Sequence, residues 1–121
     1  GRGRMSFSWV SINPANVRFS QGSIASHFSD EHAGLSLRDA CSQLRNGTLR
    51  PSDFPPMRIY NDQNGVLRSY DNRRLWVFRK TGVTNVNAQL LSNPPAYRAP
   101  PPPPASAHAD FFPKVRFEGG V

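Results

Sequence analysis

The chain has a single cysteine, Cys41, and only two lysines, Lys80 and Lys114, among its 121 residues. One thiol excludes an internal disulfide and gives no basis for a structural zinc site. The sequence has no run of 18 apolar residues, so it predicts no membrane-spanning helix. Its first residues contain no apolar stretch long enough for a secretory signal. We therefore expect an intracellular protein that binds no metal and no membrane, and nothing in the sequence indicates a cofactor.

Acidic residues are also few. The 15 Lys and Arg residues outnumber 8 Asp and Glu residues, giving a formal charge of +7 and a pI near 10.8. Such an excess is typical of proteins that bind polyanions. Nearly all of these cations are arginines, whose planar guanidinium groups pair with phosphate and stack on bases. A GC-rich genome would equally favour arginine over lysine, but it would not explain the net charge.

The apolar residues are enough for one small core. Hydrophobic residues make up 37% of the chain and aromatic residues 11%. We predict an extended N-terminal arm over residues 1–16, a folded domain over 17–91 and a Pro-rich extended tail over 92–121. A domain of this size buries only about 60–65% of its unfolded surface, so contact with a partner would help to stabilise it.

Alternating and helical patterns predict the elements of the folded domain. Residues 17–20 alternate as a short strand does, and residues 24–28 suggest one helical turn. Leu37, Ala40, Cys41 and Leu44 recur at helical spacing, and Gly47 fits the stop signal after such a helix.

The second half of the domain reads as a hairpin, a helix and a strand. Asn64-Gly65 separates two alternating runs, 57–60 and 66–70, which is a strong hairpin signal. A helix follows that Asp71 or Asn72 can cap, and residues 83–91 predict the last strand. The whole is an α/β (α+β) fold with a mixed sheet and two or three short helices.

Residues 71–74, Asp-Asn-Arg-Arg, carry the clearest chemical signal. They lie where a strand ends and a helix begins, and the first amides of a helix form a natural site for anions. Guanidinium groups at the same place would add charge-assisted hydrogen bonds to phosphate. The alternative is that Arg73 and Arg74 pair with Asp71 only to stabilise the domain. The predicted contacts for phosphate or nucleic acid are Arg18, Arg68, Asn72, Arg73, Arg74, Arg79 and Lys80.

The order of these segments resembles the ParB/sulfiredoxin superfamily. The resemblance spans the helix ending at Asn46-Gly47, the Pro-Pro lead into residues 57–60, and the segment Tyr70-Asp-Asn-Arg-Arg-Leu-Trp-Val-Phe-Arg-Lys-Thr-Gly-Val83. It implies a small ParB-like fold in which a Gly-x-x-Arg-x-x-Ala box holds nucleotide phosphates, as a CTP switch or in ATP-linked sulfinic-acid repair. Arg74 would be the box arginine, with Asp71 where glycine is usual and Val77 where alanine is usual.

The departures from the family narrow what the resemblance implies. Sulfiredoxins have a reactive cysteine just before the box His-Arg, and Asn72 stands there in this chain, which argues against that activity. ParB partition proteins add a second phosphate motif and a helix-turn-helix domain, whereas a Pro-rich tail follows here. Asp71 also places a negative charge beside the expected phosphate.

The tail predicts a docking segment. Five prolines at 100–104 form a polyproline spacer, and an aromatic and basic stretch follows it. We expect that stretch either to lie across a partner or to fold back on its own domain. The residues predicted to dock are Phe111, Phe112, Lys114, Arg116 and Phe117.

Two classes of function compete. The favoured one is a non-catalytic, basic ParB-like module that serves as a structural, RNA-binding subunit of a large ribonucleoprotein assembly, such as a lineage-specific or organellar ribosome. The other is a ParB-like enzyme, either a nucleotide hydrolase or kinase or a toxin-type nuclease, in which His27 or His32 would act with Asp30, Asp71 and Arg74. A protein-only scaffold is a third possibility. No catalytic residue is predicted, and His27, His32 and His108 lack metal-ligand spacing.

Overall fold

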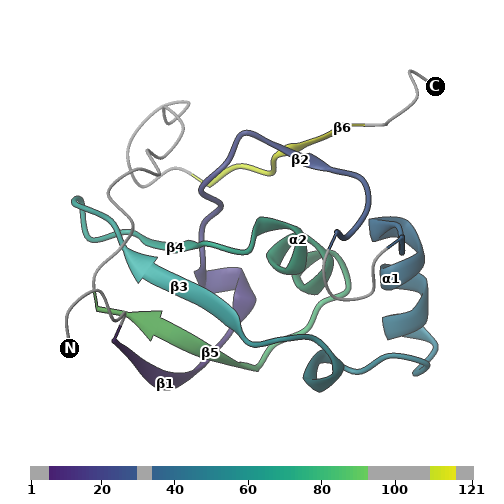
Figure 1. Ribbon diagram of the computed structural model, residues 1–121, viewed down its shortest axis with the longest axis horizontal. Helices are drawn as coiled ribbons and strands as arrows, with labels where there is room; N and C mark the ends of the chain where they lie inside the picture. Colours follow the sequence, from purple (N-terminus) through teal and green to yellow (C-terminus); the bar gives the residue numbers. More distant parts are fainter. Residues whose placement is uncertain (1–5, 30–33, 93–109, 117–121) are drawn as a thin grey trace.

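The described part of the chain folds as a small α+β domain with two sheets and two helices (Figure 1). The computed structural model describes residues 6–29, 34–92 and 110–116. Two short 3-10 turns, at Pro14–Asn16 and Pro51–Asp53, join longer elements. The helices and strands are β1 Phe7–Ile12, β2 Ser23–Ala25, α1 Leu37–Arg45, β3 Met57–Asn61, β4 Leu67–Ser69, α2 Asn72–Lys80, β5 Val86–Leu91 and β6 Lys114–Arg116.

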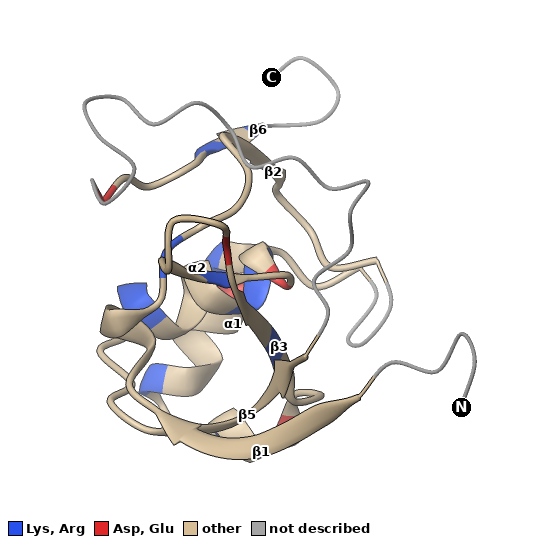
Figure 2. Cartoon of the chain, turned by 90° about the vertical axis from the view of Figure 1, so that its left-hand side faces the viewer, with Lys and Arg blue, Asp and Glu red and all other residues tan. Residues whose placement is uncertain are grey.

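The main sheet is mixed. Its strand order is β1-β5-β3-β4, in which β3 and β5 run parallel and the other two pairs run antiparallel. Strands β2 and β6 form a separate parallel pair, which lies at the top of Figure 2 with β1 at the bottom and the helices between them. The predicted fold class is therefore confirmed. No helix of the described residues is long and apolar enough to cross a membrane.

The hairpin and the two helices form where the sequence predicts them. Gly65 has a φ of +76° between β3 and β4, a conformation that glycine adopts without strain. The Ser36 hydroxyl accepts a hydrogen bond from the Asp39 amide and caps α1, and Gly47 follows the helix with a φ of +83°. The hairpin thus delivers the chain to Asp71, directly before α2.

Both helices bury one face in a single core. Leu37, Ala40 and Cys41 of α1 are buried, and Leu75 of α2 is fully buried. Burial raises the pKa of the Cys41 thiol, although the charges of Arg45 and Lys80 partly oppose the effect. The thiol thus stays protonated and packs as a small apolar group, as its place on the helix predicted.

The structure differs from the prediction in the first 28 residues. Residues 7–12 belong to the main sheet as strand β1, hydrogen-bonded to β5, rather than to an arm outside the domain. Residues 23–25 form strand β2 instead of a helical turn. Val17, Phe19 and Ser20 are buried, and the segment forms no strand of its own: it joins the sheet through an isolated bridge between Arg18 and Arg68. Each difference arises from a pairing with a segment distant in sequence.

The C-terminal segment folds back on its own domain. Residues Lys114–Arg116 pair with β2, and the rings of Phe111 and Phe112 lie 6.3 and 5.2 Å from that of Phe19. Of the two alternatives for this segment, the structure shows the second. Phe117 and the polyproline stretch lie outside the described residues.

Candidate functional site

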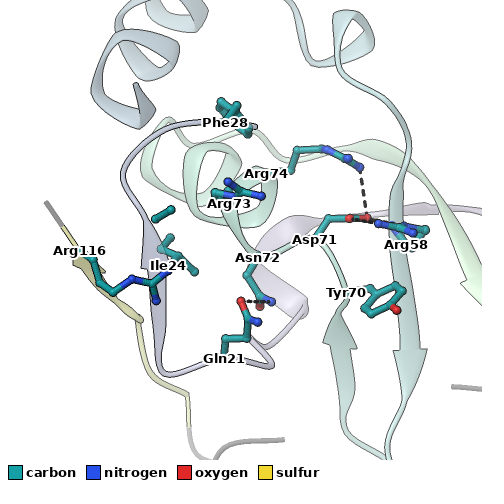
Figure 3. Close-up of a pocket in the computed structure, with 11 residues that line it drawn as sticks. Gln21, Ile24, Phe28, Arg58, Tyr70, Asp71, Asn72, Arg73, Arg74 and Arg116 are labelled. Atoms are coloured by element: carbon teal, nitrogen blue, oxygen red, sulfur yellow. Dashed lines mark hydrogen bonds and ion pairs between the residues drawn. The ribbon is translucent and has the colours of Figure 1, made fainter. Parts of the chain in front are cut away.

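A polar cavity of about 330 Å³ lies at the start of α2 (Figure 3). Its wall contains four arginines and one carboxylate. The charged residues and the tyrosine that line it are Arg58, Tyr70, Asp71, Arg73, Arg74 and Arg116. They come from β3, from the turn before α2, from α2 itself and from β6, so the cavity gathers segments far apart in sequence.

The hairpin positions the turn that opens the cavity. The Tyr70 amide donates to the Arg58 carbonyl at 2.8 Å, and the Arg58 amide donates to Asp71 Oδ2 at 2.8 Å. These two bonds fix the chain just before the first turn of α2. The first amides of a helix have no acceptor within the helix, and the cavity is formed partly by this turn.

Asp71 does not cap α2 with its side chain. Its carboxylate instead accepts two hydrogen bonds from the Arg58 guanidinium, at 3.0 Å from Nε and 2.5 Å from Nη2, and lies 3.2 Å from Arg74 Nη1. An aspartate held by two arginines no longer opposes a bound anion with its full charge. The cluster of these three residues therefore leaves the cavity positive.

Arg74 is a positioning residue. Only 10% of its side chain is exposed, and Nη1 donates to the carbonyls of Pro56 at 2.9 Å and Pro55 at 3.3 Å. Together with the contact to Asp71, these bonds tie the start of α2 to the lead into β3. The alternative of local pairing thus describes Arg74 well, although the sequence placed it at the centre of an anion site.

The accessible cations are Arg58, Arg73 and Arg116. The Arg58 side chain is 44% exposed and its guanidinium lies over the Tyr70 ring at 4.6 Å. Arg73 donates to the His27 carbonyl at 2.8 Å, and Arg116 is exposed. These three guanidinium groups line the cavity and are the ones accessible to an anion.

Asn72 joins α2 to the chain before β2. Its Oδ1 accepts from the Ser20 amide at 2.8 Å and its Nδ2 donates to the Ser20 hydroxyl at 3.0 Å. The residue is 4% exposed. It therefore contributes to the wall of the cavity rather than offering a free amide to a ligand.

The remaining predicted cations lie elsewhere. Arg68 is 3% exposed and its Nε donates to Asp62 at 2.7 Å, so it is a core residue and not a surface contact. Arg18 and Arg79 both face Asp110, at 3.7 and 2.6 Å. Lys80 lies over the Phe112 ring at 4.7 Å. Arg18, Arg79 and Lys80 thus contact the C-terminal segment and hold it on the domain.

Two contributors to the cavity were not identified as such from the sequence. For Arg58 the sequence predicts only a place in a strand, although its alternation with the buried Met57 and Ile59 is a signal that it faces the other way. Arg116 was assigned to docking, and its second role depends on the pairing of β6 with β2. Among the five residues predicted to dock, Phe111, Phe112 and Arg116 contact the domain, Lys114 is exposed on β6, and Phe117 is not described.

The histidines and other metal-type side chains that the structure describes form no catalytic or metal centre. His27 Nδ1 lies 2.8 Å from the Ser26 hydroxyl, while Asp30, His32 and His108 lie outside the described residues. Within the described ranges, no group of three or more His, Cys, Asp or Glu residues could hold a metal ion.

Asp110 is expected to make the stability of the domain depend on pH. The hydrogen bond from Arg79 lowers the pKa of Asp110 against the opposing effect of burial, and the charges of Arg79 and Arg18 add to the lowering. A lowered folded pKa gives stability that is fully present above the ordinary value, about 3.9, and lost as the pH falls through the folded value.

We therefore expect Asp110→Asn to destabilise the domain at neutral pH and to match the wild type in strong acid. Because the side chain is 36% exposed, solvent screening limits the effect to about 0.5–1 kcal/mol. Thermal melts of both proteins across the acid range measure it. Equal melting temperatures of the variant and the wild type at neutral pH would contradict a stabilising role of the Arg79–Asp110 ion pair.

The chain matches no protein-family model and no curated protein at a significant level.

Proposed function

We propose that this chain is a non-catalytic RNA-binding module, a structural subunit of a ribonucleoprotein assembly, and that the cavity at the start of α2 binds phosphate. The observation that carries the proposal is the convergence of Arg58, Arg73 and Arg116 on one polar cavity beside the first turn of a helix. Guanidinium forks and helix amides are the donors that phosphate oxygens prefer.

The charge of the whole chain supports a polyanionic ligand. The formal charge of +7 would attract RNA over a distance set by the ionic strength. The resemblance to ParB and sulfiredoxin proteins also supports a phosphate ligand, since relatives hold nucleotide phosphates at the corresponding box. Asp71 replaces the usual glycine, but Arg58 and Arg74 hold its carboxylate.

The contacts at the cavity favour binding over catalysis. A nuclease or nucleotide hydrolase needs a base within hydrogen-bond reach of its proton. The Asp71 oxygens already accept hydrogen bonds from Arg58, and the His27 ring is engaged with Ser26. Cleavage or nucleotide turnover that is lost in Arg73→Ala would instead favour the enzyme.

The first test is the salt dependence of RNA binding. We expect the affinity for a single-stranded oligouridine to fall steeply with salt, with a slope of log K against log salt of roughly −2 for three phosphate contacts. Fluorescence anisotropy at several salt concentrations measures the slope. A flat salt dependence, or no binding, would reject the RNA proposal and leave a protein-only scaffold.

Arg73→Ala is expected to weaken RNA binding and to reduce the salt slope by about 0.7, the contribution of one phosphate contact on a single strand. Arg73→Lys keeps the charge but loses the planar fork, so its RNA affinity should lie between those of Arg73→Ala and the wild type. Arg38 is exposed on α1 and does not line the cavity, so Arg38→Ala is the matched control. Equal losses in Arg73→Ala and Arg38→Ala would mean that RNA binds by overall charge and not at this cavity.

A further inference from the structure

Strand β6 brings a cation to the cavity from the far end of the described chain. The parallel pairing aligns Ala25 with Arg116 and Ser23 with Lys114. Arg116 Nη1 donates to the Ser23 hydroxyl at 2.7 Å, and Figure 3 shows the side chain extending from β6 towards β2. Arg116 thus belongs to the wall of the cavity, although the segment that carries it lies outside the predicted domain, residues 17–91.

The same segment is fastened at the opposite end of α2. The Arg79 guanidinium makes a bidentate contact with Asp110, at 3.1 and 2.6 Å. It also lies over the Phe112 ring at 4.6 Å, and Pro113 is buried. Residues 110–116 therefore run from the C-terminal turn of α2 to the cavity at its start, and each end has its own attachment.

We propose that residues 110–116 form a strap that is a working part of the phosphate site, with Arg116 as a direct phosphate contact. The inference rests on the proposed function of the cavity. Arg116 shares the cavity wall with Arg58, Arg73 and Arg74, and like charges in one site repel. A bound phosphate replaces this repulsion by attraction, so phosphate binding and docking of the strap strengthen each other, as linkage requires.

Arg116→Ala tests the contact, with Lys114→Ala as the matched control. Both variants remove one cation from the same three-residue strand, but Lys114 does not line the cavity. We expect Arg116→Ala to weaken binding of the oligouridine by about tenfold, and Lys114→Ala to change it by less than about twofold. Equal losses would overturn the strap as a phosphate contact.

Phe112→Ala tests the coupling, because it loosens the strap without changing the Arg116 side chain itself. Phe112 is 44% exposed, so the domain should remain folded, which thermal melts check. RNA binding should weaken in this variant, and adding Arg116→Ala should weaken it little further, since the two changes remove the same contribution. Wild-type affinity in Phe112→Ala would overturn the coupling.

Hydrogen exchange of the wild type supplies the reverse measurement. Oligouridine should slow exchange of the β6 amides, and unchanged exchange at saturating RNA would contradict the strap. If the wild type binds no RNA at all, the proposed function fails first. If it binds RNA and Arg116→Ala matches Lys114→Ala, only the strap proposal fails.

Discussion

Asp62→Ala is expected to destabilise the domain by about 3–5 kcal/mol, because it leaves a buried guanidinium without its carboxylate. The side chains of Asp62 and Arg68 are 6% and 3% exposed, and Asp62 Oδ2 lies 2.7 Å from Arg68 Nε. Burial alone would raise the pKa of Asp62, yet the bonds from Arg68 and from the turn amides lower it. Thermal unfolding should show a fall in the melting temperature of more than about 10 °C.

Two control variants distinguish the effect of losing the ion pair from the effect of disturbing the turn around it. Asp62 Oδ1 also accepts from the amides of Asn64 and Val66, and Asp62→Asn keeps such an acceptor while losing the charge. Gln63→Ala changes an exposed residue of the same turn and should be nearly neutral. A loss below about 1 kcal/mol in Asp62→Ala would mean that Arg68 reaches water, which would restore it as a candidate RNA contact.

Asp71→Asn is expected to change stability and RNA affinity in opposite directions. The substitution removes the charge that Arg58 and Arg74 share, so the domain should lose about 1–3 kcal/mol. RNA affinity of the folded protein should rise roughly fivefold, because about 1 kcal/mol of repulsion between the carboxylate and phosphate disappears. Chemical denaturation and anisotropy at a temperature where the variant is folded measure the two effects.

Asp39→Asn is the control for this prediction. It removes one exposed carboxylate from α1, outside the cavity, and raises the net charge by the same amount. A matching gain in RNA affinity in both variants would assign the effect to overall charge. A loss of affinity in Asp71→Asn would contradict this prediction and would show that Asp71 is needed to hold Arg58 in place.

Local signals in the sequence were enough to predict the hairpin and the helices. The helix at Leu37–Arg45 has a regular apolar spacing, a serine cap and a following glycine, and the hairpin contains Asn64-Gly65. Each of these features acts within a few residues, so the sequence alone is enough to predict it. The position of the cavity was also predictable, since it depends on a strand that leads directly into α2.

Long-range pairing accounts for what the sequence did not show. Strand β1 contains exposed Phe7 and Trp9 and has no clean alternation, so only its register with β5 identifies it as a strand. Arg68 carries a charge and lies close to residues 71–74, so the sequence predicts that it is a surface contact for phosphate. Its burial depends on Asp62 across the hairpin and on the Phe19 carbonyl, 49 residues away in sequence.

The pairing of β2 with β6 sets the order in which the protein can mature. Ser23 and Lys114 must meet across nearly the whole described chain, and contacts of such long sequence separation form late in folding. During synthesis, the hairpin and α2 can leave the ribosome and fold before residues 110–116 emerge from it. A nascent domain would thus hold an incomplete cavity, and the proposed RNA binding would reach full strength only after the C-terminal residues emerge.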